Sequence, residues 1–331
     1  MTVSISGSLG VTFPDSSLQT GAASPYVTKN RLVNGSFAID QRNAGASQTF
    51  TAAAAVAYTV DRWYGSCTGA NITGQRVAGT SPNQYAYRFT GAASNTGTLF
   101  GQRIESFNTY DLISTTVTGS VTLKSSSITS VTWTAYYANS SDTFSSKTSI
   151  ATGTLTINST ATRYSFSFDA GANAGNGIAI EFTTGALTAT NTLQYENAQL
   201  ELGTTATPFE RRLYGQELAN CQRYYYKVLP TINARFGTGY NKTTTASAAV
   251  TFFPVSMRIA PTAVEQTGTA ADYGVGNLNT GTVCNAVPTF SIANQSTAET
   301  TFNTAAVLTA GQGSLGYAVT STSYLAWSAE L

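Results

Sequence analysis

The chain has 331 residues, enough for two domains with cores of their own, and a net charge of +1. Only 10% of its residues are charged, against about 25% in an average soluble protein, so Ser and Thr supply most of its polarity and favour β-structure. It contains no histidine, which excludes Ser-His-Asp and Cys-His catalysis and the commonest zinc ligand. Basic and acidic residues are scattered singly, and this pattern argues against nucleic-acid binding.

The cysteines, Cys67, Cys221 and Cys284, are far apart and form no C-x-x-C pair, so we expect buried thiols rather than a disulfide framework or a metal site. The first residues lack the basic and apolar regions of a signal peptide, and no apolar run approaches the ~18 residues of a membrane span. The chain is therefore expected to be made and used without secretion and without membrane insertion.

Residues 1–30 are rich in Gly, Ser and Thr and predict short strands. Val3–Ser6 alternates at period two, and Val11–Phe13 runs into a turn at Pro14–Ser17. This segment is too short to bury a core, so it needs either the rest of the molecule or other copies of the chain as a partner.

In residues 31–208, apolar and polar residues alternate in several short runs, as they do in half-buried antiparallel strands. Such runs lie at Tyr85–Phe89, Val131–Tyr136 and Arg163–Phe168. A glycine-rich break at 171–177 precedes a further strand at Ile178–Phe182. Eight or more strands without an intervening helical pattern predict a β-sandwich or jelly roll.

One segment departs from this pattern. After Pro208, apolar residues recur at helical spacing, at Tyr214, Leu218, Cys221 and Tyr225. Pro230 ends the pattern. We predict a short helix within a linker, residues 209–229, between two β domains.

Strands are predicted again in residues 230–331, at Ala248–Phe253, Met257–Thr262 and Ser323–Leu331. No Lys or Arg follows Arg258. Recognition by this smaller β domain would therefore rely on aromatic stacking, hydroxyls and amides, and would depend only weakly on ionic strength.

Several segments resemble, in the same order, motifs of tail fibre and receptor-binding proteins of tailed bacteriophages. Arg31–Arg42 resembles the opening LINGdFdIWQRG of that family, and Tyr58–Trp63 resembles its YTADRW. Val11–Thr20 resembles the ItFpDGTtQ segment common near fibre N-termini, with Ser16 where glycine is usual. Further matches lie at Gln102–Glu105, Gln199–Gly203, Ala206–Glu210, Glu217–Tyr225, Phe253–Arg258 and Ser328–Leu331.

The resemblance implies an all-β virion protein: an N-terminal anchoring segment at 1–30, a carbohydrate-binding-module-like jelly roll at 31–208, a short linking helix, and a smaller C-terminal β domain at 230–331 as the receptor-binding tip. It implies a homotrimer that is assembled in the host cytoplasm and joins other tail or baseplate proteins through its N-terminus.

Trp63 and Tyr64 follow Asp61 and Arg62, a combination that suits a sugar site. An aromatic ring stacks on the apolar face of a pyranose, while carboxylate and guanidinium bind hydroxyls. The alternative is structural, with Trp63 in the core and the Asp61–Arg62 pair holding a strand end.

Three further glycan contacts are predicted, with packing in the core or between subunits as the alternative. Adjacent residues of a strand point to opposite faces, so Tyr136 and Tyr137 cannot both be buried on one face, and Tyr137 is the candidate. Tyr273 and Tyr317 stand beside glycines in predicted loops.

The run Tyr224–Tyr226 predicts either a stacking platform at the domain junction or packing between domains. The sequence contains no recognisable pair of glycosidase carboxylates and implies no cofactor. Calcium bound by Asn34, Asp40 or a C-terminal carboxylate is an alternative, although no Asp-rich loop supports it.

The leading hypothesis is a non-enzymatic adhesin, a tail fibre or tail-tip protein that binds host-surface polysaccharide. A head fibre or capsid decoration protein built from the same modules is the alternative, because modules do not report where a chain attaches. A glycan depolymerase would show the stacked repeats of a parallel β-helix, and the sequence has no such period.

Overall fold

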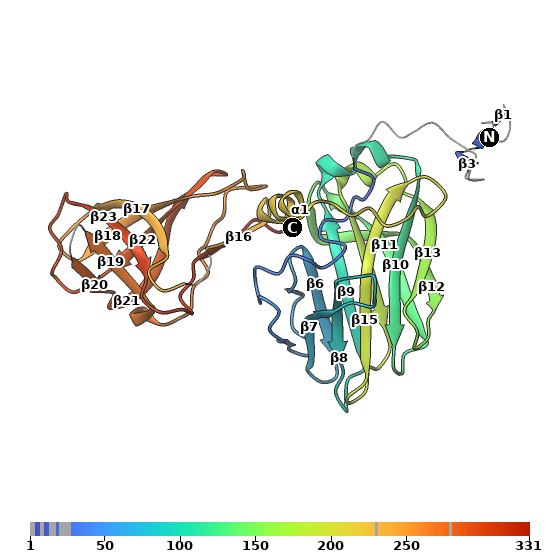
Figure 1. Ribbon diagram of the computed structural model, residues 1–331, viewed down its shortest axis with the longest axis horizontal. Helices are drawn as coiled ribbons and strands as arrows, with labels where there is room; N and C mark the ends of the chain where they lie inside the picture. The colour runs from blue at the N-terminus through green and yellow to red at the C-terminus, as the bar shows by residue number, and fades with distance from the viewer. Residues whose placement is uncertain (1–3, 7–9, 13–17, 20–27, 229–230, 278–279) are drawn as a thin grey trace.

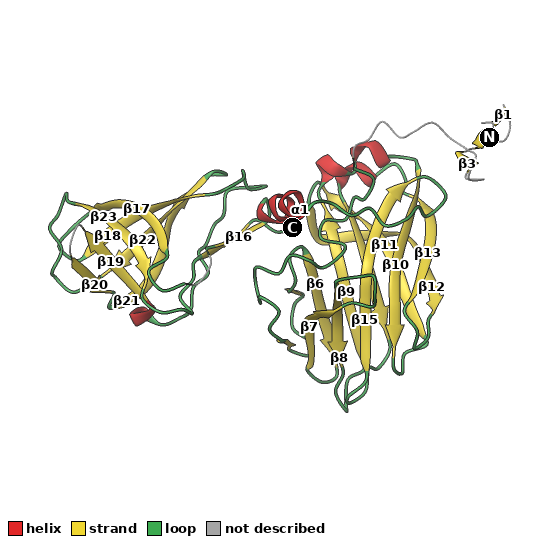
Figure 2. Ribbon diagram, in the orientation of Figure 1, coloured by secondary structure: helices red, strands yellow, loops and turns green. Residues whose placement is uncertain are grey.

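The computed structural model describes residues 4–6, 10–12, 18–19, 28–228, 231–277 and 280–331. In this part of the chain nearly all regular structure is antiparallel β-sheet, in two domains that meet beside the helix α1 (Tyr214–Gln222) (Figure 1, Figure 2). No helix in the described ranges is long and apolar enough to cross a membrane.

The N-terminal segment contributes a small antiparallel sheet of three strands: β1 (Ser4–Ser6), β2 (Gly10–Thr12) and β3 (Leu18–Gln19). The turn predicted at Pro14–Ser17 lies outside the described residues.

Two six-stranded antiparallel sheets form the jelly-roll sandwich. The first has the order β13 (Thr162–Asp169), β10 (Thr116–Ser125), β15 (Thr192–Leu202), β8 (Tyr85–Thr90), β7 (Ile72–Ala78) and β4 (Gln48–Phe50). The second has the order β12 (Thr143–Thr156), β11 (Ser130–Ser140), β14 (Ile178–Thr184), β9 (Gly97–Ile104), β6 (Trp63–Thr68) and β5 (Ala57–Tyr58). Short 3-10 turns lie at Ser106–Asn108, Tyr110–Leu112 and Ala174–Asn176. The strands predicted at 85–89, 131–136, 163–168 and 178–182 are confirmed.

Aromatic rings join the two sheets of the sandwich. Trp133 of β11 stacks on Phe166 of β13, with ring centroids 4.2 Å apart, and Phe100 of β9 stacks on Tyr87 of β8 at 4.8 Å. Each buried ring removes enough apolar surface from water to stabilise the fold by about 1.5–3 kcal/mol. The alternating runs of the sequence supply these inward-facing rings.

The second domain is a seven-stranded antiparallel sheet. Its order is β20 (Thr280–Val283), β19 (Tyr273–Asn277), β23 (Gly313–Ala318), β17 (Arg235–Asn241), β18 (Ala246–Phe252), β22 (Thr297–Asn303) and β21 (Ala286–Ala293), with a 3-10 turn at Ala270–Asp272. A two-stranded ribbon of β16 (Tyr225–Lys227) and β24 (Ala326–Ser328) connects it to α1.

The strand predicted at Met257–Thr262 is wrong. This segment is irregular and lies between β18 and the 3-10 turn at Ala270–Asp272. Pro254 precedes it and Pro261 lies within it, and both lack the N–H that a sheet ladder needs. The backbone N–H of Arg258 donates instead to the carbonyl of Arg223 at 2.7 Å. Of the strand predicted at Ser323–Leu331, only the residues of β24 are extended in a ladder.

The last residues of the chain return to the jelly roll, where the carboxylate of Glu330 forms an ion pair with the guanidinium of Arg62. Both side chains are buried, with 1% of Arg62 and 5% of Glu330 exposed. The Arg62 guanidinium also lies over the ring of Tyr224, 3.5 Å from its centroid. The Tyr58 hydroxyl donates to the carbonyl of Leu331 at 2.8 Å. These contacts fix the C-terminal domain to the sandwich.

Replacing Glu330 with Gln should lower the free energy of unfolding by about 3–5 kcal/mol, because Arg62 would stay buried without its counter-charge. Urea denaturation measures the loss. Glu299→Gln is the control, since it removes the partner of Lys242 in a pair whose side chains are 24% and 34% exposed, and an exposed pair contributes at most about 1 kcal/mol. Equal losses in the two variants would contradict this assignment.

Candidate functional site

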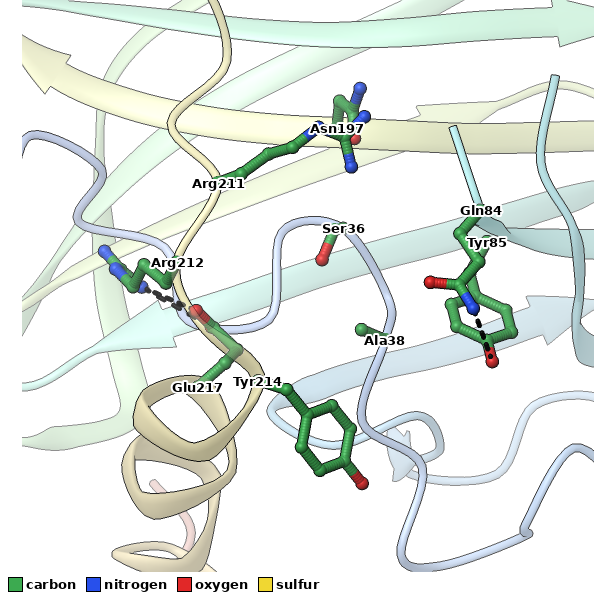
Figure 3. A pocket seen from close by; sticks show the side chains of 9 residues that line it. All are labelled: Ser36, Ala38, Gln84, Tyr85, Asn197, Arg211, Arg212, Tyr214 and Glu217. Carbon is green, nitrogen blue, oxygen red and sulfur yellow. Dashed lines mark hydrogen bonds and ion pairs between the residues drawn. The ribbon is translucent and has the colours of Figure 1, made fainter. Parts of the chain in front are cut away.

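Two adjoining cavities lie at the start of α1 and share Ala38 and Tyr214 in their walls; we call them together the α1 cleft. The smaller cavity has a volume of about 150 Å³, room for one sugar ring, and the larger about 600 Å³. The smaller is lined by Ser36, Ala38, Gln84, Tyr85, Asn197, Arg211, Arg212, Tyr214 and Glu217 (Figure 3). Polar and aromatic residues of the larger include Asp40, Gln41, Arg76, Gln222, Tyr226 and Lys227.

The loop from Asn34 to Ala38 forms the floor of the cleft and needs a glycine. A Cβ on Gly35 would lie 2.0 Å from the carbonyl oxygen of Ala198, and the backbone N–H of Ala198 donates to the carbonyl of Gly35 at 2.9 Å. Only glycine allows the loop to approach β15 this closely. The approach places Ser36 and Ala38 in the cavity wall.

Gly35→Ala should destabilise the protein by about 1–3 kcal/mol, because the new methyl group would push the loop away from β15. Gly215→Ala, in α1 where an added Cβ meets nothing within 4 Å, is the matched control and is expected to stabilise by up to about 1 kcal/mol. Thermal unfolding of the two variants checks the difference. Similar melting temperatures would show that the loop tolerates the shift.

Asn197 lies in the wall of the cleft because β15 bulges there. The ladder between β10 and β15 shifts register between Ser120 and Thr122, so that two residues of β15 oppose one of β10. Asn197 occupies the bulge with φ +48°, a left-handed conformation that Asn tolerates better than most residues. Bulges redirect side chains and are frequent beside functional sites.

The side-chain carbonyl oxygen of Asn197 is a buried acceptor without a partner among the described residues. Its amide group donates to the Oδ1 of Asn83 at 2.6 Å, and Arg211 donates to the same oxygen at 2.9 Å. Asn83 in turn donates its own amide to Glu196 at 2.6 Å. This chain of donors and acceptors fixes the amide orientation of both asparagines. The Asn197 oxygen is thus held in place as a buried acceptor that no described residue satisfies.

The helix α1 is held against the same loop by two charged side chains. Glu217 accepts a hydrogen bond from the backbone N–H of Asn34 and pairs with Arg212 at 3.3 Å. Arg212 also donates to the backbone carbonyls of Asn30 and Leu32. The position of α1, and of the Tyr214 ring at its first turn, thus follows from contacts with residues 30–34.

Tyrosines supply the stacking surfaces of the cleft. Tyr214 is 67% exposed. Tyr85 is half-buried, and the Arg76 guanidinium lies over its ring, 4.6 Å from the ring centroid. Figure 3 shows the two rings on different sides of the smaller cavity, with Ala38 between them. Tyr226 borders the larger cavity, so the cleft combines aromatic faces with polar groups, as carbohydrate sites do.

Charged groups line the larger cavity as well. Arg76 is 3.8 Å from a carboxylate oxygen of Asp40. Lys227 donates to the backbone carbonyl of Arg42 at 2.9 Å. Burial lowers the pKa of Lys227, and the charges of Glu265 and Asp40 oppose that effect.

The predicted sugar contacts in β6 lie away from the cleft. Trp63 is fully buried and stacks on Phe100, with centroids 4.9 Å apart. Tyr64 is also fully buried and donates its hydroxyl to Glu181 at 2.8 Å. Neither ring has a free face for a sugar. Their neighbours Asp61 and Arg62 are both buried, but Arg62 pairs with Glu330, and Asp61 accepts hydrogen bonds from Gln41 while burial raises its pKa to about 6.

Tyr137 is half-buried in β11, as is its neighbour Tyr136. The ladder between β11 and β12 shifts register between Ala135 and Tyr136, which interrupts the alternation assumed from the sequence. Tyr137 lines neither cavity of the α1 cleft, and its role as a glycan contact stays a prediction.

Tyr273 and Tyr317 are not in loops, which corrects the expectation from their neighbouring glycines. Tyr273 begins β19, is fully buried and donates its hydroxyl to the carbonyl of Tyr324 at 2.8 Å. Tyr317 lies in β23, half-buried, with its ring against Gly274 and Gly281. The glycines make room for this ring, so both tyrosines pack within their own domain.

In the run Tyr224–Tyr226, the first two tyrosines are buried, each 2% exposed, as expected for packing between domains rather than for a stacking platform. The third, Tyr226, borders the larger cavity of the α1 cleft. Asn34 bonds to the backbone of Ile39, and Asp40 accepts from the N–H groups of Asn43 and Gly45, so both side chains have protein partners, and calcium binding there stays a prediction. Across the described residues there is no cluster of three or more His, Cys, Asp or Glu suited to a metal.

Sequence reasoning missed the residues of the smaller cavity. The helical spacing places Tyr214 on the apolar stripe of α1, yet its side chain is exposed, because the stripe is covered only from Leu218 onward. The pair Arg211–Arg212 just before the helix is the one local signal that points to this site.

No protein-family model matches the sequence, and no curated protein is similar enough to match. Solved structures with similar folds include a family 61 carbohydrate-binding module in complex with β-1,4-galactotriose, at 11% identity and a TM-score of 0.35, over 53% of this chain and 100% of that one. A putative sugar-binding protein from Bacteroides thetaiotaomicron has 12% identity and a TM-score of 0.38, with the same coverage.

The enzymatically active domain of tailspike protein 4 from bacteriophage CBA120 is also similar, at 12% identity and a TM-score of 0.33, over 53% of this chain and 21% of that one. Carbohydrate-binding-module domains and one phage tailspike are thus among the structural neighbours. At TM-scores this low they carry no argument about what this chain binds.

Proposed function

We propose that the protein is a non-enzymatic virion adhesin, a phage tail fibre or tail-tip protein that binds host-surface polysaccharide in the α1 cleft. The observation that carries the proposal of glycan binding is a cavity the size of a sugar ring whose wall combines two tyrosines with Asn197, the side-chain oxygen of which has no partner among the described residues. An acceptor, donors and an aromatic face are the groups that orient a sugar.

The placement on a virion is supported by the ordered motifs between residues 31 and 227. These motifs do not distinguish a tail fibre from a head fibre or decoration protein, and the α1 cleft fits both. Residues 1–30 are proposed as the attachment segment that contacts other virion proteins, with the protein carried on the particle after assembly in the host cytoplasm.

Tyr214→Ala should weaken binding to host polysaccharide about tenfold, because the loss of one stacking ring removes roughly 1.4 kcal/mol, and should leave the melting temperature unchanged, since the ring is 67% exposed. Tyr240→Ala, which removes a ring 51% exposed on β17, is the matched control. Surface plasmon resonance on immobilised polysaccharide measures both. Equal affinities for the two variants would place the binding site elsewhere.

A reducing-end assay of the same polysaccharide, after incubation with the purified protein, separates an adhesin from a depolymerase. We expect no new reducing ends. Their appearance would show that the protein cleaves its ligand.

We also propose a homotrimer, which analytical ultracentrifugation at micromolar concentration tests directly. The N-terminal segment is too short to fold alone, and large apolar side chains are exposed, at 85% for Phe107 and 72% for Tyr110 on the sandwich and at 82% for Leu213 just before α1. A species with three times the mass of one chain is expected. A single monomeric species would refute the trimer.

A further inference from the structure

The α1 cleft carries an excess of positive charge. Its lining includes four cations, Arg76, Arg211, Arg212 and Lys227, against two carboxylates, Asp40 and Glu217. Arg76 pairs with Asp40 and Arg212 with Glu217. Within the described residues, neither Arg211 nor Lys227 has a carboxylate within 4 Å. The whole chain has a net charge of only +1, so this excess is local.

Arg211 has hydrogen-bonding capacity left for a ligand. One of its terminal nitrogens donates to Asn83 at 2.9 Å, and a guanidinium has five N–H donors. Because that contact anchors one side of the group, the rest can form the two parallel hydrogen bonds that a carboxylate accepts from arginine.

The acceptor of Asn197 lies next to this cation, since Asn197 and Arg211 both donate to the same oxygen of Asn83. A carboxylate has no proton to give to the Asn197 oxygen, but a hydroxyl has. The pair of protein groups therefore matches a ligand that carries an anionic group and a hydroxyl close together. A sugar acid has both on one ring.

Glu196 is the nearby carboxylate whose negative charge would repel an anionic ligand. Hydrogen-bond donors of the protein already bind both of its oxygens. Its Oε1 accepts from the backbone N–H and hydroxyl of Thr80 at 3.1 and 2.8 Å and from Gln194 at 2.7 Å, and its Oε2 accepts from Asn83. Donors surround its charge, and it orients the Asn83 amide whose oxygen accepts from Asn197 and Arg211.

We infer that the smaller cavity of the α1 cleft binds an acidic sugar, a uronic or sialic acid, with its carboxylate on Arg211 and a hydroxyl donating to the Asn197 oxygen. The inference rests on the proposed function and narrows its ligand to acidic glycans. It also separates this site from any recognition by the nearly uncharged C-terminal domain, because binding at Arg211 weakens as salt screens the charge.

The test is a glycan microarray that presents uronic-acid and sialic-acid glycans beside their carboxyl-reduced, neutral counterparts. The array also carries poly(glycerol phosphate), an anionic polymer without a carboxylate. The full-length protein should bind acidic members and lose at least tenfold in affinity for the carboxyl-reduced ones, as expected when a charged hydrogen bond is lost. Binding should also fall severalfold between about 50 and about 500 mM NaCl.

Two variants assign that preference to the cavity. Arg211→Gln should lower affinity for acidic glycans about tenfold, so that the variant no longer prefers them to their carboxyl-reduced counterparts. Asn197→Gly removes the acceptor at a position whose φ of +48° suits glycine, so it should keep the fold and lose affinity. Arg235→Gln, which alters an exposed cation of β17 outside the cleft, should bind as the unaltered protein does.

Each outcome has one meaning. Equal binding of acidic and carboxyl-reduced glycans, or an unaffected Arg211→Gln variant, overturns the acidic-sugar inference and leaves the proposed function standing. Binding of the phosphate polymer alone overturns the choice of a sugar acid. Absence of binding to every glycan on the array counts against the proposed function itself.

Discussion

The arrangement of the molecule depends on one buried charge, the guanidinium of Arg62. It pairs with Glu330 from the end of the chain, donates to the backbone carbonyl of Arg103 and lies over the ring of Tyr224 just after α1. A buried charge is tolerated only when such partners surround it. Jelly roll, helix and C-terminal ribbon therefore meet at a single side chain, and the wall of the α1 cleft is held in place as a result.

The motifs that resemble phage fibre proteins lie around this junction. The side chain of Gln102 bonds to both the N–H and the carbonyl of Val33, and Arg223 pairs with Glu105 at 3.1 Å. Segments far apart in sequence thus meet through buried polar contacts that need these residue types. The motifs describe how the domains are joined and supply part of the cleft wall, including Ser36 and Glu217, whereas Gln84 and Arg211 lie outside every motif.

Alternation in the sequence predicted the strands, because each sheet has one face against the sandwich core. Alternation did not predict the site, because it indicates on which face of a sheet a side chain lies but not whether other residues cover that face. Tyr64 points away from Trp63, yet it is buried as well, under Arg103 at 4.7 Å and beside Tyr58. The cleft could not be predicted for another reason. Asn83 and Asn197 form a hydrogen bond although more than a hundred residues separate them, and the bulge of β15 that positions Asn197 leaves no periodic signal in the sequence.

The free protein keeps two unfavourable features at Asn197, a left-handed backbone and a buried acceptor without a donor. Each costs of order 1–3 kcal/mol. They persist because the surroundings determine them: Ala198 bonds to Gly35 on one side, and Glu196 orients Asn83 on the other. A rigid cleft of this kind loses little entropy on binding, since its polar groups are already oriented. In the complex that we propose, a ligand hydroxyl on the Asn197 oxygen would offset this cost, and the site would therefore favour ligands that carry such a hydroxyl.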